Sequence, residues 1–118
     1  MVYINRQISN KVDDLLSKGK SILLLGPRQT GKTTLLKKLA PNLSISFISP
    51  RERLRYELDP SILADEVKAI ADTMDTKPLV IVDEVQKVPL IMDVAQELLD
   101  DKIAQLILTG SSARKLKH

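Results

Sequence analysis

The sequence predicts an α/β domain in which helices cover both faces of a parallel sheet. Short apolar runs alternate along the chain with segments of helical spacing, as in folds built from parallel strands and right-handed crossovers. The run at 79–82 is apolar at every position, which is typical of a central strand buried on both faces. The segment 26–33 joins an apolar run to a helical one and contains Gly26 and Gly31. These observations predict a three-layer α/β/α arrangement.

The expected strands are short and rich in Ile, Leu and Val. They cover residues 21–25, about 44–48, 79–82 and 105–109. The expected helices cover residues 9–18, 31–40, a segment that opens at Pro60, and 89–99. Asn10 is expected to cap the first helix and Gly19 to end it. The helix from Pro60 is expected to place its regularly spaced apolar residues in the core: Leu63, Val67, Ile70 and Met74.

Residues 26–33 match the phosphate-binding pattern G-x-x-x-x-G-K-S/T, with a strand-like run before them and a helix-like run after them. Glycines let the backbone curl around a phosphate, and amides at a helix start favour negative charge. Lys32 would reach the β- and γ-phosphates, and the Thr33 hydroxyl would bind Mg²⁺. The alternative is a glycine-containing turn with a solvated lysine. The predicted nucleotide-binding residues are Gly26, Pro27, Arg28, Gln29, Thr30, Gly31, Lys32, Thr33 and Thr34.

Two acids follow the buried strand at 79–82. Asp83 is expected to anchor Mg²⁺ through its water ligands. Glu84 is expected to orient or deprotonate the attacking water. The alternative is a buried strand that ends in two solvated acids. With the phosphate loop upstream, the metal and catalytic roles are the favoured interpretation.

A polar residue at the end of the strand at 105–109 would lie beside these acids. Thr109 is the candidate to contact the γ-phosphate or position water, with Ser111 as second choice. An ordinary turn through Gly-Ser-Ser is the open alternative. The predicted catalytic residues are therefore Glu84, Lys32 and Thr109, and the predicted metal-binding residues are Thr33 and Asp83.

Length and composition agree with one domain over residues 1–118, with an N-terminal helix in 1–20 and the core in 21–118. The absence of cysteine excludes disulfides and thiol chemistry, and His118 is the single histidine. The chain has one Phe, two Tyr and no Trp, which argues against aromatic platforms for RNA. No apolar run approaches the ~20 residues of a membrane span, and no signal peptide is recognised. A cytoplasmic protein without membrane contact is predicted.

The net charge of +3 comes partly from two basic clusters. They are Arg51, Arg53 and Arg55, and Arg114, Lys115 and Lys117. Such residues can contact nucleic-acid phosphates. Because Glu52, Glu57 and Asp59 are interleaved with the first cluster, a solvated helix face is the favoured interpretation.

The stretches GPRQTGKTTLL, VIVDEVQKVP and LILTGSSARKL, in this order and spacing, resemble prokaryotic AAA-type ATP-binding proteins. The resemblance covers essentially the whole chain and implies a P-loop ATPase that uses ATP and Mg²⁺. It places nucleotide and metal on Lys32, Thr33, Asp83 and Glu84, and makes 109–111 the end of the sensor strand. Relatives continue beyond the position of His118 through a fifth strand and a C-terminal region. The chain is therefore expected to be incomplete, and no arginine finger or second sensor is assigned.

The resemblance also implies the strand order 1-4-3-2, counted over the four expected strands. This order leaves the strand at 21–25 as an unpaired edge, which predicts self-association there unless the N-terminal helix covers it. The favoured function is Mg²⁺-dependent ATP binding with slow hydrolysis. The alternative is a nucleotide-binding interaction module with negligible turnover, and a phosphotransferase is a distant third.

Overall fold

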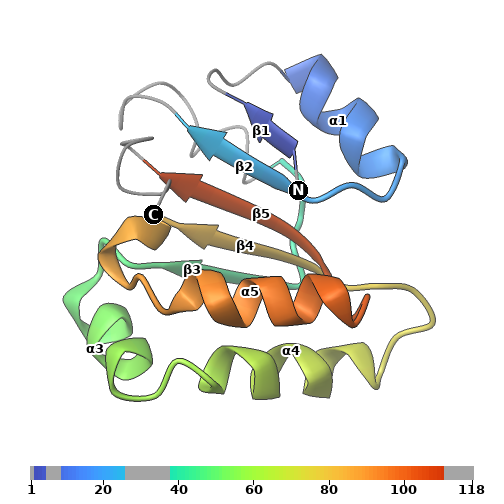
Figure 1. The fold of residues 1–118 in the computed structure, drawn as a ribbon. Helices are drawn as coiled ribbons and strands as arrows, with labels where there is room; N and C mark the ends of the chain where they lie inside the picture. Colours follow the sequence, from blue (N-terminus) through green and yellow to red (C-terminus); the bar gives the residue numbers. More distant parts are fainter. Residues whose placement is uncertain (1, 5–8, 26–37, 111–118) are drawn as a thin grey trace.

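A computed structural model describes residues 2–4, 9–25 and 38–110, which form one parallel sheet with helices on both faces (Figure 1). The strands are β1 (Val2–Ile4), β2 (Ile22–Leu25), β3 (Leu43–Ser46), β4 (Leu79–Asp83) and β5 (Gln105–Gly110). The helices are α1 (Ser9–Ser17), α3 (Pro50–Leu58), α4 (Ile62–Ala71) and α5 (Ile91–Asp100), and a 3₁₀ turn, η1, covers Val85–Lys87. The expected α/β class is confirmed.

The strand order is β1-β2-β5-β4-β3, and every neighbouring pair is parallel. The four expected strands correspond to β2, β3, β4 and β5, so the part of the order that reads β2-β5-β4-β3 is the expected order 1-4-3-2. The expected bare edge at 21–25 is wrong, because β1 pairs with β2 from Val2↔Ile22 to Ile4↔Leu24. The segment 2–4 combines β-branched and aromatic residues, which favour strand structure, but it is too short for a periodic pattern. The predicted self-association therefore loses the unpaired β2 edge on which it rested.

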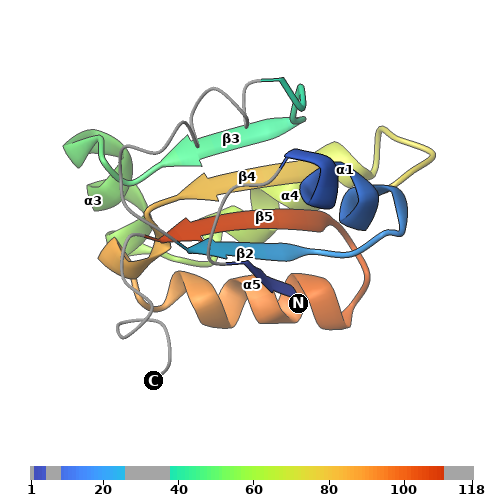
Figure 2. The ribbon, with the colours of Figure 1, turned by 90° about the horizontal axis from the view of Figure 1, so that it is seen from above.

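Alternate residues of the central strands face opposite helical layers. Leu106 and Leu108 of β5 belong to the larger core cluster, which also contains residues of α3, α4 and α5. Ile107 belongs to the smaller cluster, with Val12 of α1. In Figure 2, α1 lies in front of the sheet, while α4 and α5 lie behind it. The sheet is therefore buried on both faces, as the apolar run of β4 predicted.

Most helix boundaries follow the expected signals with small shifts, but Asn10, the expected cap, lies inside α1, and residues 31–37 of the expected helix at 31–40 lie outside the described residues. Gly19 follows α1 with a positive φ of 77°, the conformation that glycine adopts without steric cost. Pro60 and Pro89 lie in the turns that precede α4 and α5 rather than inside the helices. Among the expected core residues of the helix after Pro60, Leu63 and Val67 are buried, whereas Ile70 and Met74 are half-buried. Within the described residues, no helix is both long enough and apolar enough to span a bilayer.

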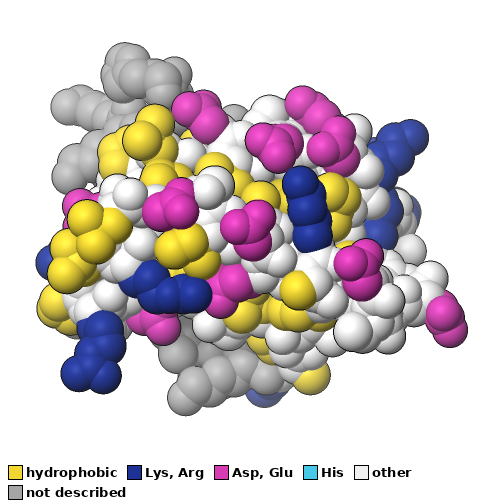
Figure 3. Space-filling view, turned by 90° about the horizontal axis from the view of Figure 1, so that it is seen from below, with side chains coloured by type: hydrophobic (Ala, Val, Ile, Leu, Met, Phe, Trp, Pro, Cys, Tyr) yellow, Lys and Arg dark blue, Asp and Glu magenta, His cyan; other side chains and the backbone are white. Residues whose placement is uncertain are grey.

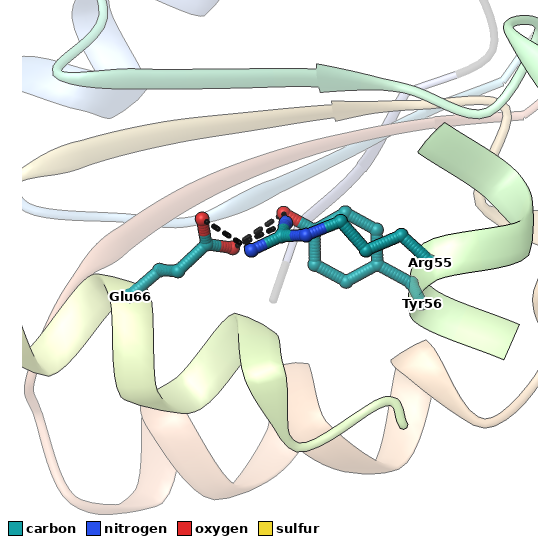
Figure 4. Close-up of polar contacts among 3 residues, drawn as sticks. All are labelled: Arg55, Tyr56 and Glu66. Carbon is teal, nitrogen blue, oxygen red and sulfur yellow. Dashed lines mark hydrogen bonds and ion pairs between the residues drawn. The ribbon is translucent and has the colours of Figure 1, made fainter. Parts of the chain in front are cut away.

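Helix α3 is joined to α4 by three side chains (Figure 4). The buried Tyr56 packs its ring against Phe47, and its hydroxyl donates a hydrogen bond to Glu66 Oε1. Arg55 Nη1 and Nη2 donate to the two oxygens of Glu66 at 3.2 and 3.3 Å. Burial, followed by the hydrogen bond to Glu66, raises the pKa of the Tyr56 hydroxyl.

The surface seen in Figure 3, where α3 and α4 lie, mixes charges of both signs with apolar side chains. Arg51 is exposed, whereas Arg53 is half-buried. Arg55 is exposed, as the expected solvated helix face requires, and it also forms an ion pair with Glu66. On this face, the described residues form no continuous basic patch.

Candidate functional site

Those predicted functional residues that the structure describes, Asp83, Glu84 and Thr109, lie at the carboxyl ends of neighbouring strands. Thr109 and Gly110 of β5 pair with Leu24 and Leu25 of β2, and Ser46 of β3 pairs with Asp83 of β4. Because all the strands are parallel, these residues share one edge of the sheet. This edge is where ligands bind in open α/β sheets.

The predicted phosphate loop leaves β2 at this same edge. The predicted nucleotide-binding residues Gly26, Pro27, Arg28, Gln29, Thr30, Gly31, Lys32, Thr33 and Thr34 lie outside the described residues, as does Ser111. The described chain nevertheless places both ends of the loop segment. It enters from Leu25 beside Gly110, and the chain after it packs Leu39 against the smaller core cluster. The described residues before and after the segment therefore lie at the polar edge and on the face of the sheet that α1 covers.

Thr109 joins the two predicted acids. Its side chain is fully buried, and it follows Ile107 by two positions, on the side of β5 that faces the smaller cluster. The hydroxyl donates a hydrogen bond to Asp83 Oδ1 and accepts one from the backbone N–H of Glu84 at 3.0 Å. A threonine hydroxyl has one proton to donate, and in this geometry Asp83 receives it. Thr109 thus holds the start of the acidic segment in a defined position.

Asp83 carries a carboxylate that hydroxyl groups orient from both sides. Oδ1 accepts from Thr109, and Oδ2 accepts from the hydroxyl of Ser46 at 3.3 Å. The side chain is half-buried, and no Lys or Arg of the described residues forms an ion pair with it. Its negative charge is therefore not balanced within the described part of the chain.

This arrangement fits a Mg²⁺ ion held together with a nucleotide. Magnesium prefers oxygen ligands and is usually bound by one or two carboxylates plus substrate phosphates. The carboxylate of Asp83 supplies such oxygens at the edge where the loop begins. Across the described ranges, no group of three or more His, Cys, Asp or Glu side chains forms a metal cage of its own. Asp83 therefore fits a magnesium site in which the protein supplies a carboxylate and the nucleotide supplies phosphate oxygens.

Glu84 has an unusual backbone and a buried side chain. Its φ of 59° and ψ of 50° place it in the left-handed region, and its exposed fraction is 1%. A residue other than glycine in this region costs on the order of 1–3 kcal/mol, and such residues cluster at functional sites. Glu84 Oε1 accepts a hydrogen bond from Gln86 Nε2 at 2.7 Å. The alternative that both acids are simply solvated is wrong for Glu84.

Sequence reasoning missed two members of this site. Ser46, at the end of β3, contacts Asp83, and Gln86, in η1, contacts Glu84. A polar residue at the end of a strand beside β4 was a usable signal for Ser46, once the strand order was known. No periodic pattern in the sequence predicted the contact of Gln86 with Glu84, because this contact depends on the left-handed backbone at Glu84.

The fold and this edge define a nucleotide-binding domain of the P-loop class. A model of a family described as an AAA domain matches residues 18–118, and the chain belongs to this family. The resemblance drawn from the three sequence stretches is thereby confirmed. A comparison with curated proteins gave no match.

Proposed function

We propose that the chain binds Mg²⁺·ATP and hydrolyses it slowly. The observation that carries the proposal is the Thr109 hydroxyl, which connects Asp83 and Glu84 at the edge where the phosphate loop begins. A metal-binding carboxylate and a neighbouring glutamate are the parts that P-loop hydrolysis needs beside the loop itself. Family membership supports nucleotide binding, and the two acids support hydrolysis as the specific reaction.

In the proposed reaction, Lys32 and the loop amides hold the β- and γ-phosphates. Thr33 and Asp83 hold Mg²⁺, which would supply charge neutralisation at the phosphate oxygens. Glu84 accepts a proton from water as the water oxygen bonds to the γ-phosphorus. The bond between this phosphorus and the oxygen that bridges to the β-phosphate breaks, and ADP leaves. Thr109 keeps Asp83 and Glu84 in place during this step.

The second candidate function is nucleotide binding with negligible turnover. The burial of Glu84 favours it, because a carboxylate with an exposed fraction of 1% has restricted access to water. The two functions share every binding residue and differ only in whether Glu84 activates water. A test must therefore measure binding and turnover separately.

The first experiment is a calorimetric titration of Mg²⁺·ATP into the chain and its Lys32→Ala variant. We expect micromolar binding that the variant loses, because the lysine charge on the phosphates is removed. Lys38→Ala is the matched control, since Lys38 is exposed and follows the loop segment. Equal binding by the chain and Lys32→Ala would contradict the proposed phosphate site.

The second experiment compares turnover in the chain and Glu84→Gln. If Glu84 activates water, the variant keeps ATP affinity and loses about 10²–10⁴-fold in rate, the usual contribution of a general base. Turnover that survives the substitution would show that Glu84 has another role. Binding without turnover in the unsubstituted chain would favour the second function.

A further inference from the structure

The Glu84 carboxylate accepts a hydrogen bond from an amide only two residues away. Gln86 Nε2 lies 2.7 Å from Glu84 Oε1, which is a short distance for a hydrogen bond from nitrogen to oxygen. Gln86 is half-buried, and Glu84 is buried. A buried carboxylate is costly unless polar groups satisfy it, so this contact contributes to keeping the acid inside the fold.

The backbone that carries Gln86 is itself anchored. The backbone N–H of Lys87 donates to the Glu84 carbonyl, and the N–H of Val88 donates to the Val85 carbonyl, both at 3.1 Å. Val85 and Val88 are buried in the larger core cluster on either side of Gln86. The amide of Gln86 is therefore presented from a short turn that the core holds in place.

Among the described contacts, one holds the Glu84 backbone and one holds its carboxylate. Thr109 Oγ1 accepts from the backbone N–H, and Gln86 donates to the carboxylate. An amide provides this restraint without a formal charge, so it orients the acid without forming an ion pair with it. A misplacement of about 1 Å at a reacting group can cost roughly 100-fold in rate, which makes such restraint catalytically significant.

We propose that Gln86 is a positioning residue that orients the Glu84 carboxylate toward the attacking water. This proposal rests on the proposed hydrolytic function, in which Glu84 activates water. Gln86 acts through Glu84, so its amide is needed for the rate of hydrolysis and not for ATP affinity.

The chain contains a matched control for this contact. Gln96 Nε2 in α5 donates to Asp100 Oδ1 at 2.8 Å, so the same two chemical groups meet at nearly the same distance. Both residues are exposed on the helix. Methionine has nearly the length of glutamine and lacks the amide, so Gln86→Met and Gln96→Met remove equivalent groups from a half-buried and an exposed position.

The test is single-turnover ATP hydrolysis, with ATP affinity measured on the same samples. We expect Gln86→Met to lower the hydrolysis rate by about 10- to 100-fold and to leave the ATP dissociation constant within about twofold. Gln96→Met should match the unsubstituted chain in both quantities. A hydrolysis rate in Gln86→Met equal to that of the unsubstituted chain would overturn the proposal.

A double-mutant cycle with Glu84→Gln separates positioning from a general structural effect. If Gln86 acts through the carboxylate, Gln86→Met has no further effect on the rate in the Glu84→Gln background. An equal loss of rate in both backgrounds would overturn the positioning role. If Gln86→Met does not fold, as judged by its thermal unfolding, the isosteric Gln86→Glu replaces the donor with an acceptor and takes its place in the cycle.

The same measurements distinguish this proposal from the hydrolytic function itself. If the unsubstituted chain hydrolyses ATP no faster than Glu84→Gln, the proposed role of Glu84 in activating water is wrong. The positioning role of Gln86, which depends on it, is then wrong as well. If the unsubstituted chain is faster than Glu84→Gln but equal to Gln86→Met, hydrolysis stands and only the role of Gln86 is wrong.

Discussion

Two pairs of a hydroxyl and a carboxylate lie in different parts of this fold. At the carboxyl edge of the sheet, Thr109 donates a hydrogen bond to Asp83. Between α3 and α4, Tyr56 donates one to Glu66. In both pairs, the residue that carries the hydroxyl is buried, with exposed fractions of 0% for Thr109 and 1% for Tyr56. The two pairs therefore have the same local chemistry and differ in their surroundings.

The difference lies in how each carboxylate charge is balanced. Glu66 receives two hydrogen bonds from the Arg55 guanidinium, which forms an ion pair with it. Asp83 receives its second hydrogen bond from the neutral hydroxyl of Ser46. A carboxylate that is paired with a cation contributes to stability, whereas an oriented carboxylate that has no cationic partner among the described residues can bind an external cation. The comparison supports a role in stability for the pair between α3 and α4 and is consistent with the proposed metal-binding role of the pair at the carboxyl edge.

The largest effect that tests this comparison is expected for Asp83→Asn. The variant keeps an oxygen that can accept from Thr109 but loses the charge that would attract Mg²⁺. Since metal-ion catalysis contributes several kcal/mol, we expect Mg²⁺-dependent turnover to fall by about 100-fold or more, with little change in the unfolding temperature. Asp75→Asn removes the same charge from an exposed residue before β4 and should leave turnover unchanged. Full turnover in Asp83→Asn would contradict the metal site.

A smaller effect is expected for Thr109→Val, which removes the hydroxyl and keeps the shape of the side chain. Asp83 and the Glu84 N–H both lose their shared partner, and a buried N–H without a partner costs about 1–3 kcal/mol of stability. We expect turnover to fall by about 10- to 100-fold, because both acids lose their orientation. Thr109→Ser retains the hydroxyl and should recover most of the rate. Equal impairment of the two variants would show that the methyl packing of Thr109, and not its hydroxyl, is required.

The sheet and the acidic positions could be predicted because they depend on local pattern. The apolar run of β4 faces both core clusters, so it had to be a central strand, and Asp83 follows it directly. The place of Thr109 beside the acids was predicted from nucleotide-switch ATPases, in which a polar residue at the tip of this strand lies between the acidic and phosphate-binding elements. The strand order itself came from the family resemblance, because periodicity does not specify which strands are neighbours.

The features that sequence analysis missed depend on contacts that the spacing of apolar residues along the chain does not predict. β1 has three residues, so its place beside β2 follows from the assembled sheet rather than from the sequence of 2–4. Arg55 is exposed as expected, but its partner Glu66, 11 positions later, was not recognised because the two meet only where α3 and α4 pack together. Gln86 was not recognised because the left-handed turn at Glu84 brings its amide to the carboxylate.

Tyr56→Phe tests the second pair of the comparison, Tyr56 and Glu66 between α3 and α4. The variant retains the packing on Phe47 and loses the hydrogen bond to Glu66, so we expect the free energy of unfolding to fall by about 1–2 kcal/mol. ATP affinity and turnover should not change. Denaturant unfolding measures the loss, with Ser17→Ala as the control, since Ser17 is exposed and its hydroxyl bonds only to a nearby backbone carbonyl. A change in turnover would show that the α3–α4 pair also affects the acidic edge.

The smallest predicted effect is the pH dependence of stability that Tyr56 causes. Burial and the hydrogen bond to Glu66 raise the pKa of Tyr56 above its ordinary value of 10.0 in the folded chain. As the pH rises through this ordinary value, the hydroxyl ionises in the unfolded chain and stays protonated in the folded one. The stability from this group is therefore complete below about pH 9 and declines above it, by a few tenths of a kcal/mol at about pH 10.

Comparing the free energies of unfolding of the unsubstituted chain and Tyr56→Phe between about pH 8 and about pH 10.5 isolates this contribution, because the other tyrosine and the lysines titrate in both proteins. The stability advantage of the unsubstituted chain should narrow as the pH rises. An advantage that is constant over this range would show that the Tyr56 hydroxyl ionises as readily in the folded chain as in the unfolded one, and an advantage that grows would show that it ionises more readily in the folded chain. In either case the contact with Glu66 would not hold the proton on Tyr56 in the folded chain.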